Sequence, residues 1–213
     1  MEGIQSIEAA LRMAMDRLAQ DGIIAYPTET VWGLGACADR PMAVDRLLGW
    51  KGRASNSPLA VLVPDIATAE SIGCELSESI LRLMDAFWPG PLMIVVPCKE
   101  RWAPGVARAD GALGLRCSSH PLAAGLSRAV LAAGMAPLTS TSLNRSGEPP
   151  AENLAQATRL LSAAADAPLL VSATGCEAGG ELPSTVVDCT GNSFSILREG
   201  AIEREAIEVV AKG

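Results

Sequence analysis

Small polar and cationic side chains gather in loops that directly follow short apolar runs of the sequence. Ligands of open α/β sheets bind at the ends of the strands, so loops of this composition are where a binding site is expected. We expect these loops to converge on a single cavity, lined by groups that can bind an anion. The segments that share the pattern are Thr28-Glu29-Thr30, Lys51-Gly52-Arg53, Arg116, Ser140 to Gly147, Pro183-Ser184-Thr185 and Arg198-Glu199-Gly200.

Lys51, Gly52 and Arg53 place two cations around a glycine at the end of a predicted helix. One interpretation is phosphate capture, in which arginine acts as a planar fork and lysine as a point charge. The other is the ordinary preference of a helix C-terminus for cations, which contributes less than about 1 kcal/mol. The motif alone does not separate the two.

The segment from Ser140 to Asn144 follows an apolar strand and is dense in hydroxyl and amide groups. Such groups can orient a nucleotide, but they also build ordinary turns through local hydrogen bonds. The same two interpretations apply to Ser184, which stands beside Pro183.

Arg116 lies inside the apolar stretch 111–117. A charge is not buried in such surroundings without an anionic partner, because its desolvation is costly. Either a carboxylate of the protein or an anionic ligand must supply that partner. His120, by contrast, precedes Pro121 at a predicted helix start, which favours a capping or orienting role over that of a base.

The composition argues against several classes of protein. The chain has 213 residues, a formal charge of −7, fourteen Arg, three Lys and one His. This charge argues against a broad nucleic-acid surface, and the single histidine excludes a His-based zinc site. Six cysteines without a Cys-x-x-Cys pair predict reduced, mostly buried thiols. Without a recognisable signal peptide or membrane-spanning run, we expect a cytoplasmic protein.

Predicted helices and strands alternate, which indicates an α/β domain with helices covering a largely buried sheet. A hairpin signal at 190–193 predicts that the sheet is mixed, and we expect one domain over residues 1–213. The predicted helices are 6–20, 41–50, 77–87, 121–131, 153–163 and 202–211, and the predicted strands are 23–26, 59–63, 92–96, 112–117, 137–141, 169–172, 185–189 and 194–198.

Seven sequence blocks occur in order along nearly the whole chain. They are Tyr26 to Gly35, Lys51-Gly52-Arg53 with Pro58-Leu59, Trp88 to Leu92, Gly114 to Cys117 with His120-Pro121, Ser140 to Gly147, Pro183 to Asp188 and Ile196 to Gly200. In this order they resemble the YrdC/TsaC family of threonylcarbamoyl-AMP synthases, in the short form without an extra carboxy-terminal domain. The resemblance implies a YrdC-like fold, a twisted mixed sheet flanked by helices with a ligand cavity at the strand ends.

The resemblance also implies an activity. It is that of a nucleotidyltransferase that makes threonylcarbamoyl-AMP and pyrophosphate from L-threonine, bicarbonate and ATP, with Mg²⁺ accompanying the ATP. Partner proteins would then use the adduct to modify the adenosine beside the tRNA anticodon. Any contact of this chain with RNA would be weak, and no contact with a membrane is expected.

The same resemblance assigns the site. The residues implied for catalysis and ATP binding are Lys51, Arg53, Ser142 and Asn144, with Ser55 and Arg198 as further ATP contacts, and those implied for L-threonine are Thr28, Arg116, Ser140 and Ser184. The sequence identifies no metal ligands. Replacing Lys51 with alanine is expected to lower turnover by orders of magnitude and to leave thermal stability little changed.

Two other functions remain open. The first is a non-catalytic RNA-binding module, against which the charge of −7 argues, because phosphate neutralisation dominates affinity for RNA. The second is a carbamoyl-adenylate-forming carbamoyltransferase domain, as in hydrogenase-maturation proteins. Nothing in the chain resembles the acylphosphatase and zinc-finger modules that accompany that domain.

Overall fold

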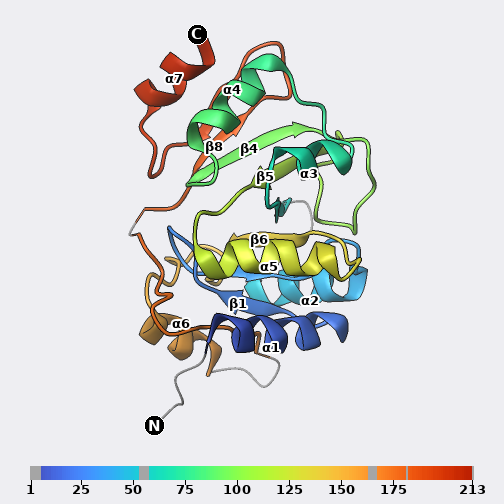
Figure 1. Cartoon of the computed structure of the whole chain (residues 1–213), viewed down its shortest axis with the longest axis vertical. Helices are drawn as coiled ribbons and strands as arrows, with labels where there is room; N and C mark the ends of the chain where they lie inside the picture. The colour runs from blue at the N-terminus through green and yellow to red at the C-terminus, as the bar shows by residue number, and fades with distance from the viewer. Residues whose placement is uncertain (1–5, 53–57, 163–166, 181, 213) are drawn as a thin grey trace.

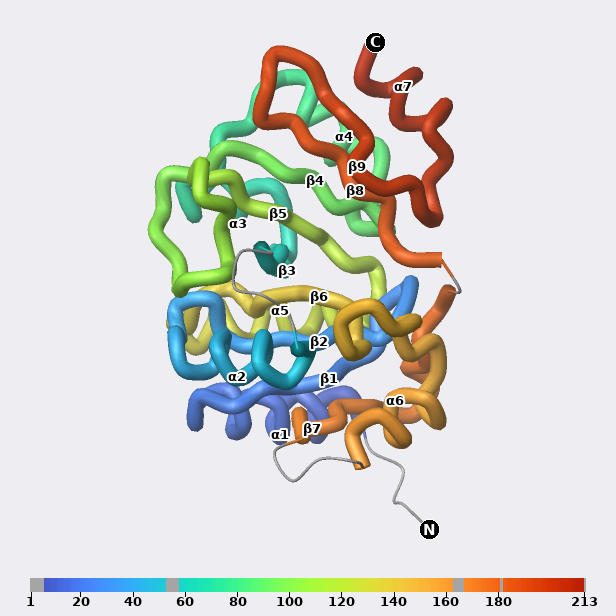
Figure 2. The backbone as a smooth tube through the Cα atoms, turned by 180° about the vertical axis from the view of Figure 1, so that it is seen from behind, coloured from blue at the N-terminus to red at the C-terminus, as the bar shows by residue number. Residues whose placement is uncertain are grey.

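A nine-stranded sheet organises the part of the chain that the computed structural model describes, residues 6–52, 58–162, 167–180 and 182–212. Its strands are β1 (Ile24–Tyr26), β2 (Gly33–Gly35), β3 (Ala60–Leu62), β4 (Leu92–Pro97), β5 (Ala112–Arg116), β6 (Leu138–Ser142), β7 (Leu169–Leu170), β8 (Thr185–Asp188) and β9 (Ser195–Arg198). Their order is β7-β1-β2-β6-β3-β5-β4-β8-β9, from the lower to the upper end of Figure 2. Three of the pairs, β1–β7, β3–β5 and β4–β8, are parallel, and the other neighbours are antiparallel. The predicted mixed α/β sheet is therefore confirmed.

Helices pack on both faces of this sheet (Figures 1 and 2). They are α1 (Ile7–Ala19), α2 (Pro41–Lys51), α3 (Ile66–Ser71), α4 (Glu78–Phe87), α5 (Pro121–Ala132), α6 (Leu154–Leu161) and α7 (Arg204–Lys212). Helices α1 and α5 pack together on one face of the β1–β2–β6 half, and α2 covers the opposite face. Helix α4 packs against α7 at the far end of the molecule. None of the described helices is both long enough and apolar enough to cross a membrane.

Local sequence fixes where several helices begin. The side chains of Ser6, Ser77 and Asn153 each accept a hydrogen bond from a backbone amide of the first turn of α1, α4 and α6. These caps satisfy amides that have no partner within the helix. Pro41 and Pro121 open α2 and α5, where a missing N–H costs nothing.

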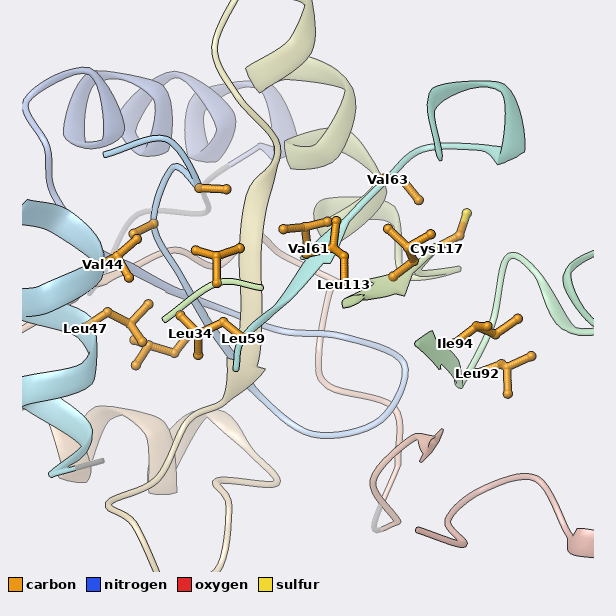
Figure 3. Packing of buried hydrophobic residues seen from close by; sticks show 14 of the residues in the cluster. Leu34, Val44, Leu47, Leu59, Val61, Val63, Leu92, Ile94, Leu113 and Cys117 are labelled. Carbon is orange, nitrogen blue, oxygen red and sulfur yellow. The ribbon is translucent and has the colours of Figure 1, made fainter. Parts of the chain in front are cut away.

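The buried apolar residues form two clusters, one on each face of the sheet. Figure 3 shows the larger, in which Val44 and Leu47 of α2 pack near Leu34 of β2, and Ile94 of β4 lies further along. The smaller cluster joins α1 and α5 to β-strand residues such as Leu138. Because side chains alternate along a strand, the face covered by α1 and α5 is also the face on which the cavity described below lies.

The sequence predictions missed β2 and α3, and placed some ends differently. Strand β7 has two residues, not four, and α7 begins at Arg204, not at residue 202. Residue 163, the predicted end of α6, lies outside the described residues. Strand β2 was missed because its sequence, Gly-Leu-Gly, has none of the β-branched or aromatic residues typical of strands.

Gly33 in β2 is required by the ring of Tyr26, which lies over it from β1. A Cβ atom at position 33 would stand 2.9 Å from two carbons of that ring, and Tyr26 is fully buried. Glycine here allows a buried aromatic ring to approach the backbone of the neighbouring strand.

We therefore expect Gly33→Ala to destabilise the protein by about 1–3 kcal/mol, since an overpacked core side chain must move. Urea unfolding measures the change. Gly49→Ala is the matched control, because position 49 in α2 is exposed and has no atom within 4 Å of an added Cβ. That variant should gain up to about 1 kcal/mol from helix propensity. Equal stability of Gly33→Ala and the unmodified protein would contradict the packing described here.

Candidate functional site

A cavity of about 410 Å³ lies over one face of the sheet. Several of its lining residues stand at strand ends: Gly33 begins β2, Ala60 begins β3, Arg116 ends β5 and Arg198 ends β9. The complete lining among described residues is Thr30, Val31, Trp32, Gly33, Pro58, Ala60, Met93, Arg116, Ser140, Thr141, Ser142, Asn144, Pro150, Pro183, Ser184, Val186 and Arg198.

Strand register brings one half of this lining together. Gly33 of β2 is opposite Ser142 of β6, and Ala60 of β3 is opposite Ser140 of the same strand. Ser140 and Ser142 are two residues apart, so both side chains point to the same face. Hydroxyl groups from β6 thus lie beside the small residues of its two neighbours, which leave room for a ligand.

The other half is a row across four adjacent strands. Arg116 of β5 is opposite Met93 of β4, Met93 is opposite Val186 of β8, and Val186 is opposite Arg198 of β9. A β-bulge between Val186 and Val187 shifts the register of β9. It places Arg198 in this row and leaves Leu197 59% exposed. The bulge thus directs an arginine at the cavity, as bulges near functional sites commonly do.

Arg116 is buried in a ring of oxygen acceptors. Its Nη2 donates to Glu29 Oε1 at 3.1 Å, to Thr30 Oγ1 at 2.7 Å and to Thr28 Oγ1 at 3.2 Å. The Ser118 hydroxyl also donates to the Glu29 carboxylate. Burial opposes ionisation of Glu29, but the Arg116 charge and the Ser118 hydrogen bond outweigh it and keep the pKa of Glu29 below its usual value. A carboxylate of the protein therefore supplies the anion that burial of Arg116 demands.

Three buried polar atoms of cavity-lining residues have no hydrogen-bond partner within the described part of the chain. They are Nε of Arg116, Oγ of Ser184 and Nε1 of Trp32. Such atoms are costly unless something binds them. A ligand in the cavity that carries a carboxylate or another acceptor would provide the missing hydrogen bonds.

The cavity is electrostatically suited to anions. Burial, and then the nearby positive charge of Arg116, lower the pKa of Arg198. The Arg198 guanidinium is held at the rim by two hydrogen bonds to the Ser184 carbonyl, at 3.1 and 2.8 Å. No Asp or Glu is present among the described residues that line the cavity. Two guanidinium groups thus face a space into which no described carboxylate projects.

Lys51 lies behind the side of the cavity that β6 and the loop after it form. It is buried, and its Nζ donates to the carbonyl of Ser142 and to both the carbonyl and Oδ1 of Asn144, the latter two at 3.1 and 2.9 Å. Ser142 Oγ donates to Asn144 Oδ1 at 2.7 Å. Lys51 thus holds the loop after β6 in place. Because its removal would leave these acceptors unsatisfied, the structure gives a reason to expect that Lys51→Ala lowers stability as well as turnover.

The polar loops around Lys51 and Asn144 make the local interactions that the structural interpretation predicts. Lys51 is the last residue of α2 and Gly52 follows in the left-handed conformation with φ of 63°, an ordinary helix C-terminus. The amide of Asn144 donates to the Glu148 carbonyl at 2.7 Å and so builds the following turn. Ser142 and Asn144 nevertheless line the cavity as well.

The structure brings most of the predicted site residues together. Those that line the cavity are Arg116, Ser140, Ser142, Asn144, Ser184 and Arg198, while Thr28 and Lys51 contact it through Arg116 and the β6 loop. Arg53 and Ser55 lie outside the described residues.

Sequence reasoning assigned no role to Glu29, Thr30, Trp32, Pro58 and Met93. Glu29 and Thr30 belong to the polar segment 28–30 that the sequence indicated, and the need of Arg116 for an anion was the signal that could have identified Glu29 as its partner. Trp32, Pro58 and Met93 contribute mainly apolar surface to the cavity. An apolar residue has no sequence feature that distinguishes a cavity wall from the core.

His120 is a capping residue, as predicted. Its Nδ1 accepts from the Leu122 amide at 3.3 Å, and its Nε2 lies 3.1 Å from the Glu177 carbonyl. Burial lowers the pKa of His120, which favours the neutral ring that this arrangement needs. Within the described ranges, no group of three or more His, Cys, Asp or Glu side chains could hold a metal ion.

A mixed α/β sheet with a cationic, hydroxyl-lined cavity is suited to a small anionic ligand. A family model described as "Telomere recombination", Sua5/YciO/YrdC, matches residues 16–200. The chain belongs to the Sua5/YciO/YrdC family.

Two relatives of this chain carry the name of an enzyme. The chain is 34% identical over 194 residues to threonylcarbamoyl-AMP synthase of Bacillus subtilis (strain 168), covering 91% of this chain and 54% of the relative. It is 35% identical over 178 residues to threonylcarbamoyl-AMP synthase of Nitrosococcus oceani, covering 84% and 92%. The chain thus spans about half the length of the first relative and nearly all of the second.

Solved structures share the fold. The crystal structure of P. abyssi Sua5 complexed with L-threonine matches with a TM-score of 0.84 and 28% identity, over 94% of this chain and 56% of that one. The crystal structure of E. coli YciO matches with a TM-score of 0.76 and 21% identity, over 91% and 90%. At that identity, the second match is informative about the fold alone.

Proposed function

We propose that this chain is a threonylcarbamoyl-AMP synthase, a nucleotidyltransferase that converts L-threonine, bicarbonate and ATP to threonylcarbamoyl-AMP and pyrophosphate. The observation that carries the proposal is the buried wall of the cavity, where Arg116 Nε and Ser184 Oγ lack partners within the described chain. The names of the two synthases support the reaction, and the L-threonine complex of P. abyssi Sua5 supports the substrate.

In this proposal Arg116 and Ser184 bind the carboxylate of threonine. Ser140 lines the same part of the cavity, and Thr28 acts through its hydrogen bond to Arg116. Glu29 fixes one edge of the Arg116 guanidinium, so the group is already oriented when the substrate arrives. Preorganisation of this kind reduces the entropy lost on binding.

ATP would occupy the side of the cavity formed by the β6 loop and β9. Ser142, Asn144 and Arg198 line that side, and Lys51 holds the loop from behind. Arg53 and Ser55, which lie outside the described residues, complete the nucleotide contacts in this proposal. Arg198 would contact a phosphate, for which its planar guanidinium is suited.

The proposed reaction begins when the amine of threonine and bicarbonate form a carbamate with loss of water. A carbamate oxygen then attacks the α-phosphorus of ATP, the new P–O bond forms, and the bond to the β-phosphate breaks to release pyrophosphate. The chain contributes positioning and stabilisation of the charge that develops on the phosphates. Mg²⁺ bound to the ATP substrate would neutralise part of that charge.

The product would pass to partner proteins in the cytoplasm that modify tRNA. The chemistry supports transfer, because a mixed anhydride of a carbamate and a phosphate is reactive towards nucleophiles and water. A non-catalytic RNA-binding module and a carbamoyl-adenylate-forming carbamoyltransferase are the competing functions, and the assay below distinguishes all three.

We expect threonine-dependent release of pyrophosphate, and labelled bicarbonate incorporated into an AMP-linked product, when the protein is given ATP, Mg²⁺ and L-threonine. Carbamoyl phosphate in place of threonine and bicarbonate is the control for the carbamoyltransferase. Absence of the adduct together with tight, salt-sensitive RNA binding would favour the RNA-binding module. Turnover of carbamoyl phosphate alone would favour the carbamoyltransferase.

We expect Ser184→Ala to raise the KM for L-threonine by about 10–100-fold, the value of a hydrogen bond to a charged group. Its stability should be unchanged, because the Ser184 hydroxyl has no partner among the described residues.

Ser127→Ala is the matched control for this variant. Ser127 is equally buried, but its hydroxyl donates to the Ala124 carbonyl at 2.9 Å within α5. This control should alter stability and leave the KM for L-threonine unchanged. A KM for Ser184→Ala equal to that of the unmodified protein would remove the serine from the proposed threonine site.

A further inference from the structure

Cys74 and Cys98 face each other across a short antiparallel contact between the segment after α3 and the end of β4. The amide of Lys99 donates to the Gly73 carbonyl at 3.0 Å, and the amide of Glu75 donates to the Pro97 carbonyl at 2.9 Å. These two hydrogen bonds flank the cysteines, so Cys74 and Cys98 form a non-hydrogen-bonded pair. In such pairs the Cα atoms are about 4.5 Å apart, which lies within the range that a disulfide spans.

The two sulfur atoms also interact chemically. The hydrogen bond with Cys74 lowers the pKa of the Cys98 thiol, and the backbone amide of Glu100 lowers it further against the opposing effect of burial. The same hydrogen bond raises the pKa of Cys74, and burial adds to that rise. Cys98 Sγ also donates to the Ile72 carbonyl at 3.3 Å, and either sulfur of this interacting pair can act as the nucleophile.

Other cysteines of the chain have different surroundings. Burial raises the pKa of Cys37, Cys117 and Cys189 to about 11, so these thiols stay protonated at neutral pH. Cys98 is 9% exposed and Cys74 is 8% exposed. Such limited access favours a small oxidant over a bulky one.

We propose that Cys74 and Cys98 are a redox-reactive dithiol that a hydroperoxide converts to a cross-strand disulfide. The thiolate of one cysteine attacks one oxygen of the hydroperoxide, the O–O bond breaks, and a sulfenic acid forms as hydroxide or alkoxide leaves. The thiol of the other cysteine then attacks the sulfenic sulfur, the S–O bond breaks, and water leaves with the proton of the attacking thiol. With hydrogen peroxide, two thiols and one oxidant give one disulfide and two waters, and a thiol reductant reverses the change.

The disulfide would join two parts of the fold that are otherwise connected through α4 and β4. Strand β4 carries Met93 in the cavity wall near its start, and Cys98 directly follows its end. Oxidation would thus fix the segment between α3 and α4 to the strand that forms one wall of the cavity. This inference does not depend on the proposed function, because it rests on the cysteine pair alone.

The sequence allows a direct test by peptide mapping. Cleavage after Arg53, Arg82 and Lys99 places Cys74 on peptide 54–82 and Cys98 on peptide 83–99, with no other cysteine on either. We treat the folded protein with hydrogen peroxide, block free thiols by alkylation under denaturing conditions, and digest it. We expect the two peptides to be linked with loss of two hydrogen atoms, and dithiothreitol to separate them. The cross-link should raise Tm by about 5 °C or more, because it restricts the unfolded chain.

Cys74→Ser and Cys98→Ser are the matched variants, and each should abolish the linked peptide. Each variant should instead leave the remaining cysteine without a resolving thiol, so that a dimedone probe traps its sulfenic acid. Alkylation of both cysteines at the level of the untreated protein would overturn the proposal. So would cross-links distributed evenly over all six cysteines, which would indicate oxidation of unfolded chains.

Discussion

Burial of the Arg116 guanidinium is the constraint on which the rest of the site depends. A charge in the interior is stable only with an opposite charge and hydrogen-bond acceptors around it. Glu29, Thr28 and Thr30 supply these for Nη2 of Arg116 from the segment that joins β1 to β2, and Nε is left without a partner among the described residues. That segment must therefore lie against the end of β5, which links the β1–β2 part of the sheet to the β5–β4 part. The ion pair that orients Arg116 thus also fixes one wall of the cavity.

The remaining walls follow from strand order and register. Hydroxyls of β6 and small residues of β2 and β3 form one side, while the β-bulge in β9 brings Arg198 to the other. Lys51 reaches through from α2 to hold the loop after β6, so a helix on the opposite face supports the site. Anionic ligands suit this arrangement because positive charge faces the space and the paired carboxylate of Glu29 lies outside the lining.

Sequence patterns predicted the alternation of helices and strands, the mixed sheet and most of the polar residues at the site. The buried charge of Arg116 was deduced from its apolar neighbours, but its partner was not, because Glu29 is 87 positions away. A simple alternation in β9 does not reveal which of Leu197 and Arg198 faces inward, since the bulge that decides it depends on pairing with β8. Strand β2 was missed because its glycines carry no strand signal of their own: Gly33 is required by the ring of Tyr26 on β1, and Gly35 by residues 138 and 139 of β6.

The most direct test of the account is a crystal structure of the protein with L-threonine and a non-hydrolysable ATP analogue. We expect the threonine carboxylate within hydrogen-bond distance of Arg116 and Ser184, with Glu29 still paired to Arg116, and the nucleotide beside Asn144 and Arg198. Ligands bound elsewhere on the protein, or Arg116 paired only with Glu29 while both ligands occupy the cavity, would contradict it.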